Sequence, residues 1–181
     1  RAPHFKPDWG SIPAAVWQRV KLVFVCSPHN PCGSVMQKAD WAELFELQSR
    51  YGFIIAADEC YSEIYFEGEP PIGCLQAAAE LGRDFSKLVM FTSLSKRSNV
   101  PGLRSGFVAG DAALLKDFLL YRTYHGSAMG IPVQMASIAA WNDETHVLEN
   151  RRLYQEKFAR VLQILAQGFE VTRPDASFYI W

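Results

Sequence analysis

The fold is decided by the stretch Lys87-Leu88-Val89-Met90-Phe91-Thr92-Ser93-Leu94-Ser95-Lys96, in which an apolar run leads straight into a short polar segment. A short apolar run bounded by turn residues is typical of a buried strand. Comparable runs cover residues 20–26, 53–57 and 105–109. We therefore predict strands at these places, with polar residues close behind them.

Helical patterns alternate with these strands. Residues 38–51 carry apolar side chains at helical spacing, and Gly52 follows as a residue suited to end a helix. We expect further helices over 74–81, 111–124, 132–141 and 144–167, two more strands over 169–172 and 178–181, and no strong period in residues 1–18. This alternation predicts an α/β sheet with right-handed crossovers. The connection after Lys96 has no helical pattern, so the 105–109 strand can run antiparallel to its neighbour.

Polar residues follow the predicted strands at the places where a ligand site would form. Asn30 lies in the turn Asn30-Pro31-Cys32-Gly33, and Asp58 ends the 53–57 run with Tyr61 three residues later. Ser93, Ser95 and Lys96 follow the next strand, and Arg104 comes eight residues after Lys96. In an open α/β sheet the carboxyl ends of the strands face the ligand crevice. We therefore expect these side chains to gather at one edge of the sheet.

Each of these residues also has an ordinary structural explanation. The lysine could lie on the surface, the aspartate could start a turn, the tyrosine could pack, the asparagine could serve its turn and the arginine could form a surface ion pair. The order in which the residues occur, rather than any one of them, supports a functional site.

The ordered set Asn-Pro-x-Gly, Asp-x-x-Tyr, Ser-x-x-Lys and Arg resembles the pyridoxal-phosphate (PLP) aminotransferases of fold type I, the class I/II family. The resemblance implies an α/β fold, namely part of that family's large-domain mixed sheet with flanking helices, plus the beginning of the small domain. It implies pyridoxal 5′-phosphate as cofactor, amino acids and keto acids as substrates, and a homodimer. The family usually carries threonine at the position of Cys32.

The resemblance also assigns roles to single residues. It makes Lys96, Asp58 and Tyr61 catalytic: the lysine bonds the cofactor aldehyde and moves protons, and the carboxylate keeps the pyridine nitrogen protonated. Tyr61 and Asn30 would hydrogen-bond the cofactor's phenolic oxygen. The phosphate would be held by Ser93, Ser95 and Arg104, because arginine offers a fixed fork of donors.

The match to the family predicts how the chain is divided. Residues 1–143 are expected to form part of the large PLP-binding α/β domain, and residues 144–181 a long connecting helix and the start of the small C-terminal domain. We expect a central to C-terminal fragment of an enzyme, with the phosphate-binding loop and the arginine for the substrate carboxylate outside it. Stretches 58–65, 93–102 and 121–126 are similar to bacterial N-succinyldiaminopimelate aminotransferases, which exchange an amino group with glutamate on the lysine route.

Composition excludes several other classes of protein. The 181 residues have a net charge of -1 and scattered basic residues, which disfavours a nucleic acid or an anionic membrane as partner. No apolar run approaches the roughly 18 residues of a membrane span. The four cysteines form no Cys-x-x-Cys and have no matched histidine, so we expect no metal site and a cytoplasmic location.

Two alternatives to an aminotransferase stay open. A PLP lyase of the same fold would share every cofactor residue named above. A chain without catalytic activity, which folds but binds no cofactor, is the second. A nicotinamide-binding domain is disfavoured because the sequence has no Gly-x-Gly-x-x-Gly.

Overall fold

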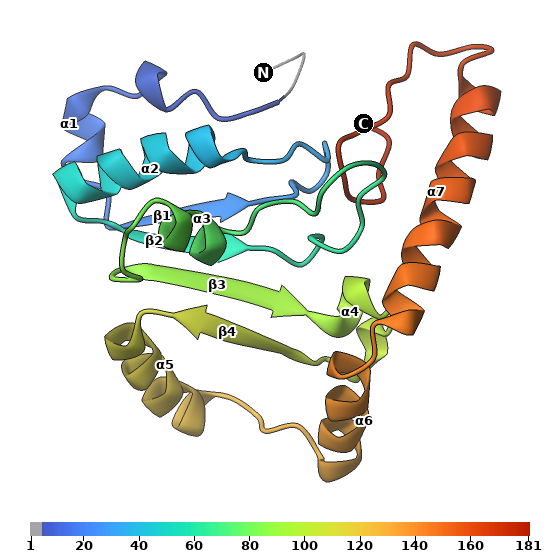
Figure 1. The fold of residues 1–181 in the computed structure, drawn as a ribbon. Coiled ribbons are helices and arrows are strands. Elements are labelled where there is room, and N and C mark those ends of the chain that lie inside the picture. The colour runs from blue at the N-terminus through green and yellow to red at the C-terminus, as the bar shows by residue number, and fades with distance from the viewer. Residues whose placement is uncertain (1–4) are drawn as a thin grey trace.

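A mixed four-stranded sheet forms the centre of the molecule in the computed structural model, which describes residues 5–181 (Figure 1). The strands are β1 (Leu22–Cys26), β2 (Ile54–Asp58), β3 (Leu88–Ser93) and β4 (Gly106–Gly110), adjacent in that order. β1, β2 and β3 are parallel, and β4 pairs with β3 in the antiparallel sense. The predicted α/β class and the antiparallel 105–109 strand are confirmed.

Helices connect and flank these strands. Their bounds are α1 (Ala14–Trp17), α2 (Lys38–Tyr51), α3 (Cys74–Glu80), α4 (Leu94–Arg97), α5 (Ala112–His125), α6 (Ile131–Trp141) and α7 (Thr145–Leu165), with 3-10 helices η1 (Trp9–Ser11) and η2 (Pro101–Leu103). The five helices predicted from residue 38 onward are confirmed with small differences at their ends.

Local chemistry explains where two of these helices begin and end. The Oδ1 atom of Asp111 accepts hydrogen bonds from the backbone N–H groups of Ala113 (2.8 Å) and Leu114 (3.3 Å), which would otherwise lack partners at the start of α5. α2 ends at Gly52, whose φ of 76° lies in the left-handed region that glycine adopts without strain. Both signals are present in the sequence.

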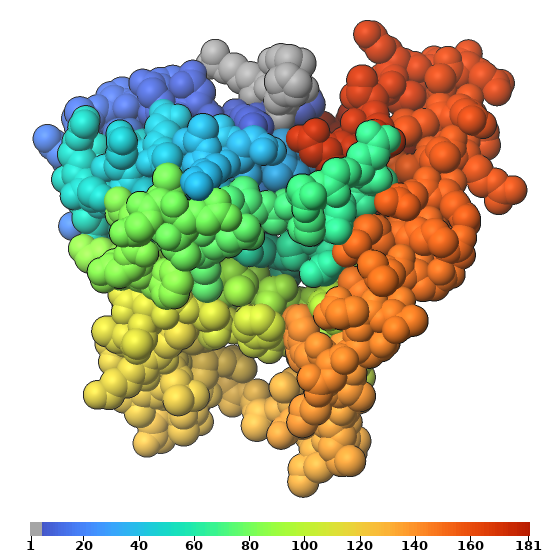
Figure 2. Space-filling model, in the orientation of Figure 1, coloured from blue at the N-terminus to red at the C-terminus, as the bar shows by residue number. Residues whose placement is uncertain are grey.

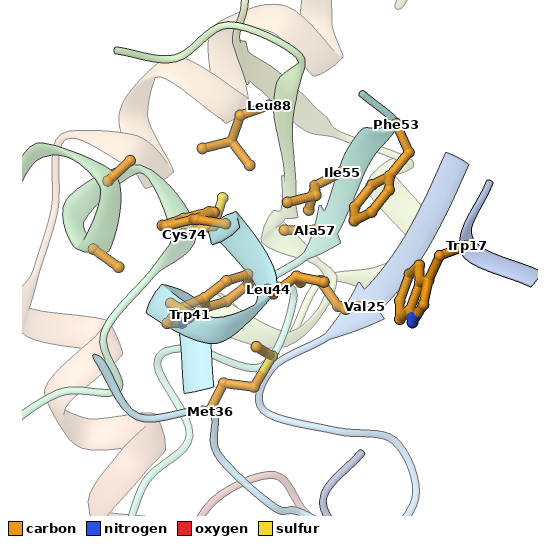
Figure 3. Packing of buried hydrophobic residues seen from close by; sticks show 13 residues of the cluster. Trp17, Val25, Met36, Trp41, Leu44, Phe53, Ile55, Ala57, Cys74 and Leu88 are labelled. Atoms are coloured by element: carbon orange, nitrogen blue, oxygen red, sulfur yellow. The ribbon is translucent and has the colours of Figure 1, made fainter. Parts of the chain in front are cut away.

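The hydrophobic core lies between the sheet and the helices α1, α2 and α3 (Figure 3). Trp41 and Leu44 of α2 are completely buried and face Ile55 of β2, which is also completely buried. Trp17 of α1 stacks on Phe53, with 5.4 Å between ring centroids. These contacts cover one face of the sheet with the helices.

Apolar side chains also lie exposed outside this core. Phe24 of β1 is 75% exposed and Phe107 of β4 is 46% exposed. α5 contains no buried residue although much of it is apolar, and Figure 2 shows α5 and α6 standing apart at the lower edge of the molecule. The described residues therefore cover one side of the sheet much better than the rest.

The prediction for the beginning of the chain needs a correction. Residues 1–4 lie outside the described residues, but within residues 5–18 the chain forms η1 and α1, where the sequence shows no period. α1 is a single turn, which is too short to produce a recognisable pattern. Its Trp17 nevertheless belongs to the core and is 3% exposed.

The two strands predicted at the end of the chain are wrong. Residues 169–172 and 178–181 form no strand. Between them the chain makes an isolated bridge, Tyr65 with Ala176, and a backbone hydrogen bond from Ala176 N to Gly33 O at 3.1 Å. A strand needs a continuous backbone partner. Aromatic packing adds to these backbone contacts, because the ring centroids of Phe178 and Tyr179 lie 5.2 and 6.0 Å from that of Tyr61.

The predicted boundary between residues 143 and 144 falls in the turn between α6 and α7. The assignment of the two sides to a large and a small domain stays a prediction. Within the described part of the chain, no helix has the length and apolar character that crossing a membrane requires.

We predict that Leu44→Ala destabilises the protein by about 2–5 kcal/mol, because it removes a completely buried side chain from a packed core. Urea unfolding followed by circular dichroism would measure the change. Glu46→Ala on the exposed side of the same helix is the control and should change the free energy of unfolding by less than about 0.5 kcal/mol. Equal effects of the two substitutions would contradict this packing.

Candidate active site

The parallel register places the carboxyl ends of β1 and β2 at the same level, and β3 continues two residues further, to Ser93. Cys26 of β1 is the register partner of Asp58 of β2, and Asp58 is the partner of Phe91 of β3. The backbone pairing continues beyond the strands, since Ser27 N donates to Asp58 O at 3.0 Å. The segments after these strands therefore start side by side, which brings the predicted polar residues to one edge.

Tyr61 lies at the meeting point of these segments. Its side chain is buried, with 4% exposure, and its hydroxyl accepts a hydrogen bond from Asn30 Nδ2 at 3.3 Å. The same hydroxyl shares a hydrogen bond with the hydroxyl of Tyr179 at 3.1 Å. Burial and the Tyr179 hydrogen bond raise the pKa of Tyr61 above its ordinary value of 10.0. The hydroxyl is therefore a fixed, neutral hydrogen-bonding group.

Lys96 projects toward the same tyrosine. Its Nζ lies 5.7 Å from the ring centroid of Tyr61 and 5.0 Å from that of Phe178, within the range of cation–π contact. The polar segment that contains Lys96 shows no helical pattern in the sequence, but it forms the one-turn helix α4. Four residues are too few to show a helical period.

Asp58 stands at the carboxyl end of β2 with an exposed side chain. Its Oδ1 accepts a hydrogen bond from Cys60 N at 3.0 Å, which holds the carboxylate at the start of the following loop. A cavity of about 590 Å³ opens beside it, lined also by Cys26 and His29. The predicted position of Asp58, at a strand end facing open space, is thus found.

The pKa of the Cys60 thiol is shifted by the groups around it. Burial raises the pKa of its thiol to about 12, with a further rise from Asp58 and an opposing effect from Lys96. The direct contacts among the predicted catalytic residues and Asn30 are those of Tyr61 with Asn30 and with Lys96. Asp58 begins the loop that carries Tyr61.

The two predicted phosphate serines lie together. The Oγ of Ser93 accepts a hydrogen bond from Ser95 N at 3.0 Å and lies 2.8 Å from Ser95 Oγ. Ser93 is the N-cap of α4 and also approaches Ser105 O at 2.9 Å, so its hydroxyl has a structural role as well. These contacts place both hydroxyls at the amino end of α4.

Arg104 is close to Ser93 and Ser95 in the sequence, but its guanidinium group hydrogen-bonds within its own turn. It has a φ of 52°, and its Nη1 donates to Pro101 O at 2.9 Å within its own turn. Among the contacts of the described residues, none joins the Arg104 guanidinium to Ser93 or Ser95. The side chain is exposed, so its other guanidinium donors can reach an anion in solvent.

Sequence reasoning missed three aromatic residues of this site. Phe178 lies beside Lys96, Tyr179 bonds Tyr61, and the ring of Tyr154 stacks on Phe178 at 5.6 Å. In the sequence, the run Phe178-Tyr179 favours a strand, and Tyr154 fits the core side of a helix. The aromatic content of the final residues is the signal that could have pointed to Phe178 and Tyr179.

The side chains present fit the PLP that the sequence resemblance implies. The amine matches the cofactor aldehyde, and the carboxylate at the strand end matches the ring nitrogen. The amide–phenol pair matches the phenolic oxygen, and the two hydroxyls with the guanidinium match the phosphate. Among residues 5–181, no group of three or more His, Cys, Asp or Glu side chains is placed to hold a metal ion.

We predict that the Tyr61 hydroxyl makes stability fall at alkaline pH. A pKa raised in the folded state means that stability is complete below the ordinary value of 10.0 and is lost as pH rises through the folded pKa. Urea unfolding at about pH 9 and about pH 11 would show a smaller alkaline loss for Tyr61→Phe than for wild type. Tyr124→Phe, at a position 84% exposed, should keep the wild-type loss, and the same loss in all three proteins would refute the prediction.

Comparison with known proteins identifies the family. Residues 1–181 match the family model described as aminotransferase class I and II. An LL-diaminopimelate aminotransferase of Desulforudis audaxviator (strain MP104C) is 34% identical over 181 residues, covering 98% of this chain and 45% of that protein. The chain thus spans less than half the length of this curated relative.

Solved structures agree with this match. An aminotransferase from Neisseria meningitidis is 74% identical with a TM-score of 0.94, covering 99% of this chain and 46% of that chain. A probable N-succinyldiaminopimelate aminotransferase from Thermus thermophilus is 26% identical with a TM-score of 0.85, covering 96% of this chain and 46% of that chain. The chain therefore belongs to the class I and II aminotransferases, a family of PLP-dependent enzymes.

Proposed function

We propose that the protein carrying this chain is an aminotransferase in which Lys96 is the residue that bonds PLP. One observation carries the proposal: Lys96 Nζ lies 5.7 Å from the ring of Tyr61, and the Tyr61 hydroxyl is bonded to Asn30. These residues follow three adjacent strands and occur in the order of the family motifs. Lys96 is only partly exposed, and the tyrosine that it faces is buried.

The other residues would hold the cofactor around this lysine. When bound, PLP supplies an electron sink for the electrons of the substrate Cα–H bond. Asp58 would contact the ring nitrogen, because a carboxylate there favours the protonated ring. Tyr61 and Asn30 would donate to the phenolic oxygen, and Ser93, Ser95 and Arg104 would bind the phosphate.

Lys96 would also carry the protons of the reaction. Once its amine is neutral, Nζ can take the proton from the substrate Cα and later return a proton, acting as general base and then as general acid. Its two aromatic neighbours, Tyr61 and Phe178, limit where the amine can move. Tyr61 would thus have two roles, one through its hydroxyl and one through its ring.

We propose a diaminopimelate-type amino diacid as the substrate, with glutamate and 2-oxoglutarate as the second pair. The similar stretches 58–65, 93–102 and 121–126 support the N-succinylated form, with a place in lysine biosynthesis. The name of the relative from Desulforudis audaxviator supports the unmodified LL-form instead. Assaying both compounds therefore belongs to the test of the proposal.

We also propose a homodimer as the working assembly. The apolar side chains exposed on α5 and α6 support it, among them Leu119 at 69%, Leu120 at 61%, Ile131 at 72% and Met135 at 67%. Exposed apolar surface of this kind marks contact with further protein. Light scattering on the complete protein would test the assembly, and a monomer at every concentration would contradict it.

We predict that Lys96→Ala abolishes covalent binding of PLP. Borohydride reduction after PLP addition to the complete protein, followed by peptide mass mapping, should place the wild-type adduct on Lys96. Lys157→Ala is a matched control, because the Nζ of Lys157 also lies 5.0 Å from an aromatic ring, that of Tyr154. An unchanged amount of adduct in Lys96→Ala, or an adduct spread over several lysines in wild type, would refute the assignment.

We predict that the complete protein converts glutamate to 2-oxoglutarate in a half-reaction limited to about one equivalent per PLP site. A diaminopimelate keto acid added afterwards should restore the starting absorbance. Product beyond one equivalent without a keto acid, or elimination products, would indicate a lyase instead. No reaction and no adduct would indicate the catalytically silent alternative.

A further inference from the structure

We infer that one stripe of α7, formed by His146, Asn150 and Tyr154, positions Lys96 for its chemistry. The inference rests on the proposed function of Lys96. The three residues are spaced four apart, so they lie on the same side of the helix. None of them belongs to the motifs that identify the family in this sequence.

Asn150 is the centre of this stripe. Its Nδ2 donates to the backbone carbonyl of Lys96 at 3.1 Å and approaches that of Arg97 at 3.4 Å. The last carbonyls of a helix have no partner within the helix, and α4 ends at Arg97. Asn150 therefore satisfies carbonyls at the end of the single turn that carries the lysine.

The residues after Lys96 are fixed from the same direction. The buried Arg97 donates to Ala140 O at 2.8 Å and pairs with Glu144. Ser98 Oγ shares a hydrogen bond of 2.8 Å with His146 Nε2, and His146 Nδ1 contacts Asp143. The end of α4 is thus tied to the α6–α7 junction through backbone and side chains, and Figure 1 shows α4 beside the start of α7.

Tyr154 acts near the amine of Lys96, whereas Asn150 acts on its backbone. Its ring stacks on Phe178 with an interplanar angle of 13°, and Phe178 lies 5.0 Å from Lys96 Nζ. One helix face therefore holds both the backbone of Lys96 and an aromatic ring beside its amine. A lysine side chain is long and flexible, so a fixed backbone and a fixed neighbour reduce the positions its amine can take.

A positioning role differs from a general structural role in what it affects. A misplaced lysine slows the formation of its bond to the PLP aldehyde, while the phosphate and ring contacts are made by other residues. Pyridoxamine 5′-phosphate has no aldehyde and cannot bond a lysine, so its affinity measures those other contacts alone. The two ligands separate the position of Lys96 from the integrity of the site.

The test uses the complete protein with Asn150→Leu and Asn150→Asp, two variants of similar size that cannot donate to the carbonyls. Gln155→Leu is the matched control, because Gln155 lies on the same helix and its Nε2 donates to Phe66 O at 3.0 Å, away from Lys96. Stopped-flow absorbance after mixing with excess PLP gives the rate of covalent capture. Equilibrium dialysis gives the dissociation constant of pyridoxamine 5′-phosphate.

We expect both Asn150 variants to capture PLP roughly tenfold more slowly, with the dissociation constant of pyridoxamine 5′-phosphate within about twofold of wild type. Gln155→Leu should match wild type in both. An unchanged capture rate, or an equal loss of capture and of pyridoxamine 5′-phosphate affinity, would overturn the positioning role. Failure of wild type to form an adduct on Lys96 would instead overturn the proposed function itself, and this inference with it.

Discussion

The parallel register of β1, β2 and β3 is the constraint on which the site depends. Because Cys26, Asp58 and Phe91 stand at one level, the chain segments that follow them must begin next to one another. Asn30, Tyr61 and Lys96 come from three different segments, and this register lets Tyr61 contact both of the others. The core around Trp41 and Leu44 packs against one face of the sheet. It holds the register in place because a shift of a strand would expose buried side chains.

α7 adds a second constraint beside the ends of the strands. It contacts the end of α4 through Asn150, the loop after β2 through Arg151, whose Nη2 lies 2.7 Å from Glu63 Oε2, and the C-terminal segment through Tyr154. The charges of Arg151 and Glu63 are only partly exposed, so solvent screens this pair less than it would a surface pair. A single helix thus links the three segments that surround the lysine amine.

The fold and the reactive residues are largely predictable because they depend on local patterns. The strand before Lys96, the helix stop at Gly52 and the cap at Asp111 are encoded by nearby residues, and the structure has all of them. α1 and α4 could not be predicted, because a helix of a single turn is too short to show a helical period in the sequence. The strands expected at 169–172 and 178–181 are absent because these residues find no strand to pair with, and Phe178 and Tyr179 pack their rings on Tyr61 instead.

The sequence by itself determined the class of fold, the family and the order of the polar residues at the strand ends. Only the tertiary structure decided which of them touch: Tyr61 bonds Asn30, and Arg104 turns toward its own loop. It also brought Phe178, Tyr179 and Asn150 to residues far away in the chain. The physical reason is that a local pattern fixes the backbone of one segment, whereas a contact between distant segments depends on how all of them pack.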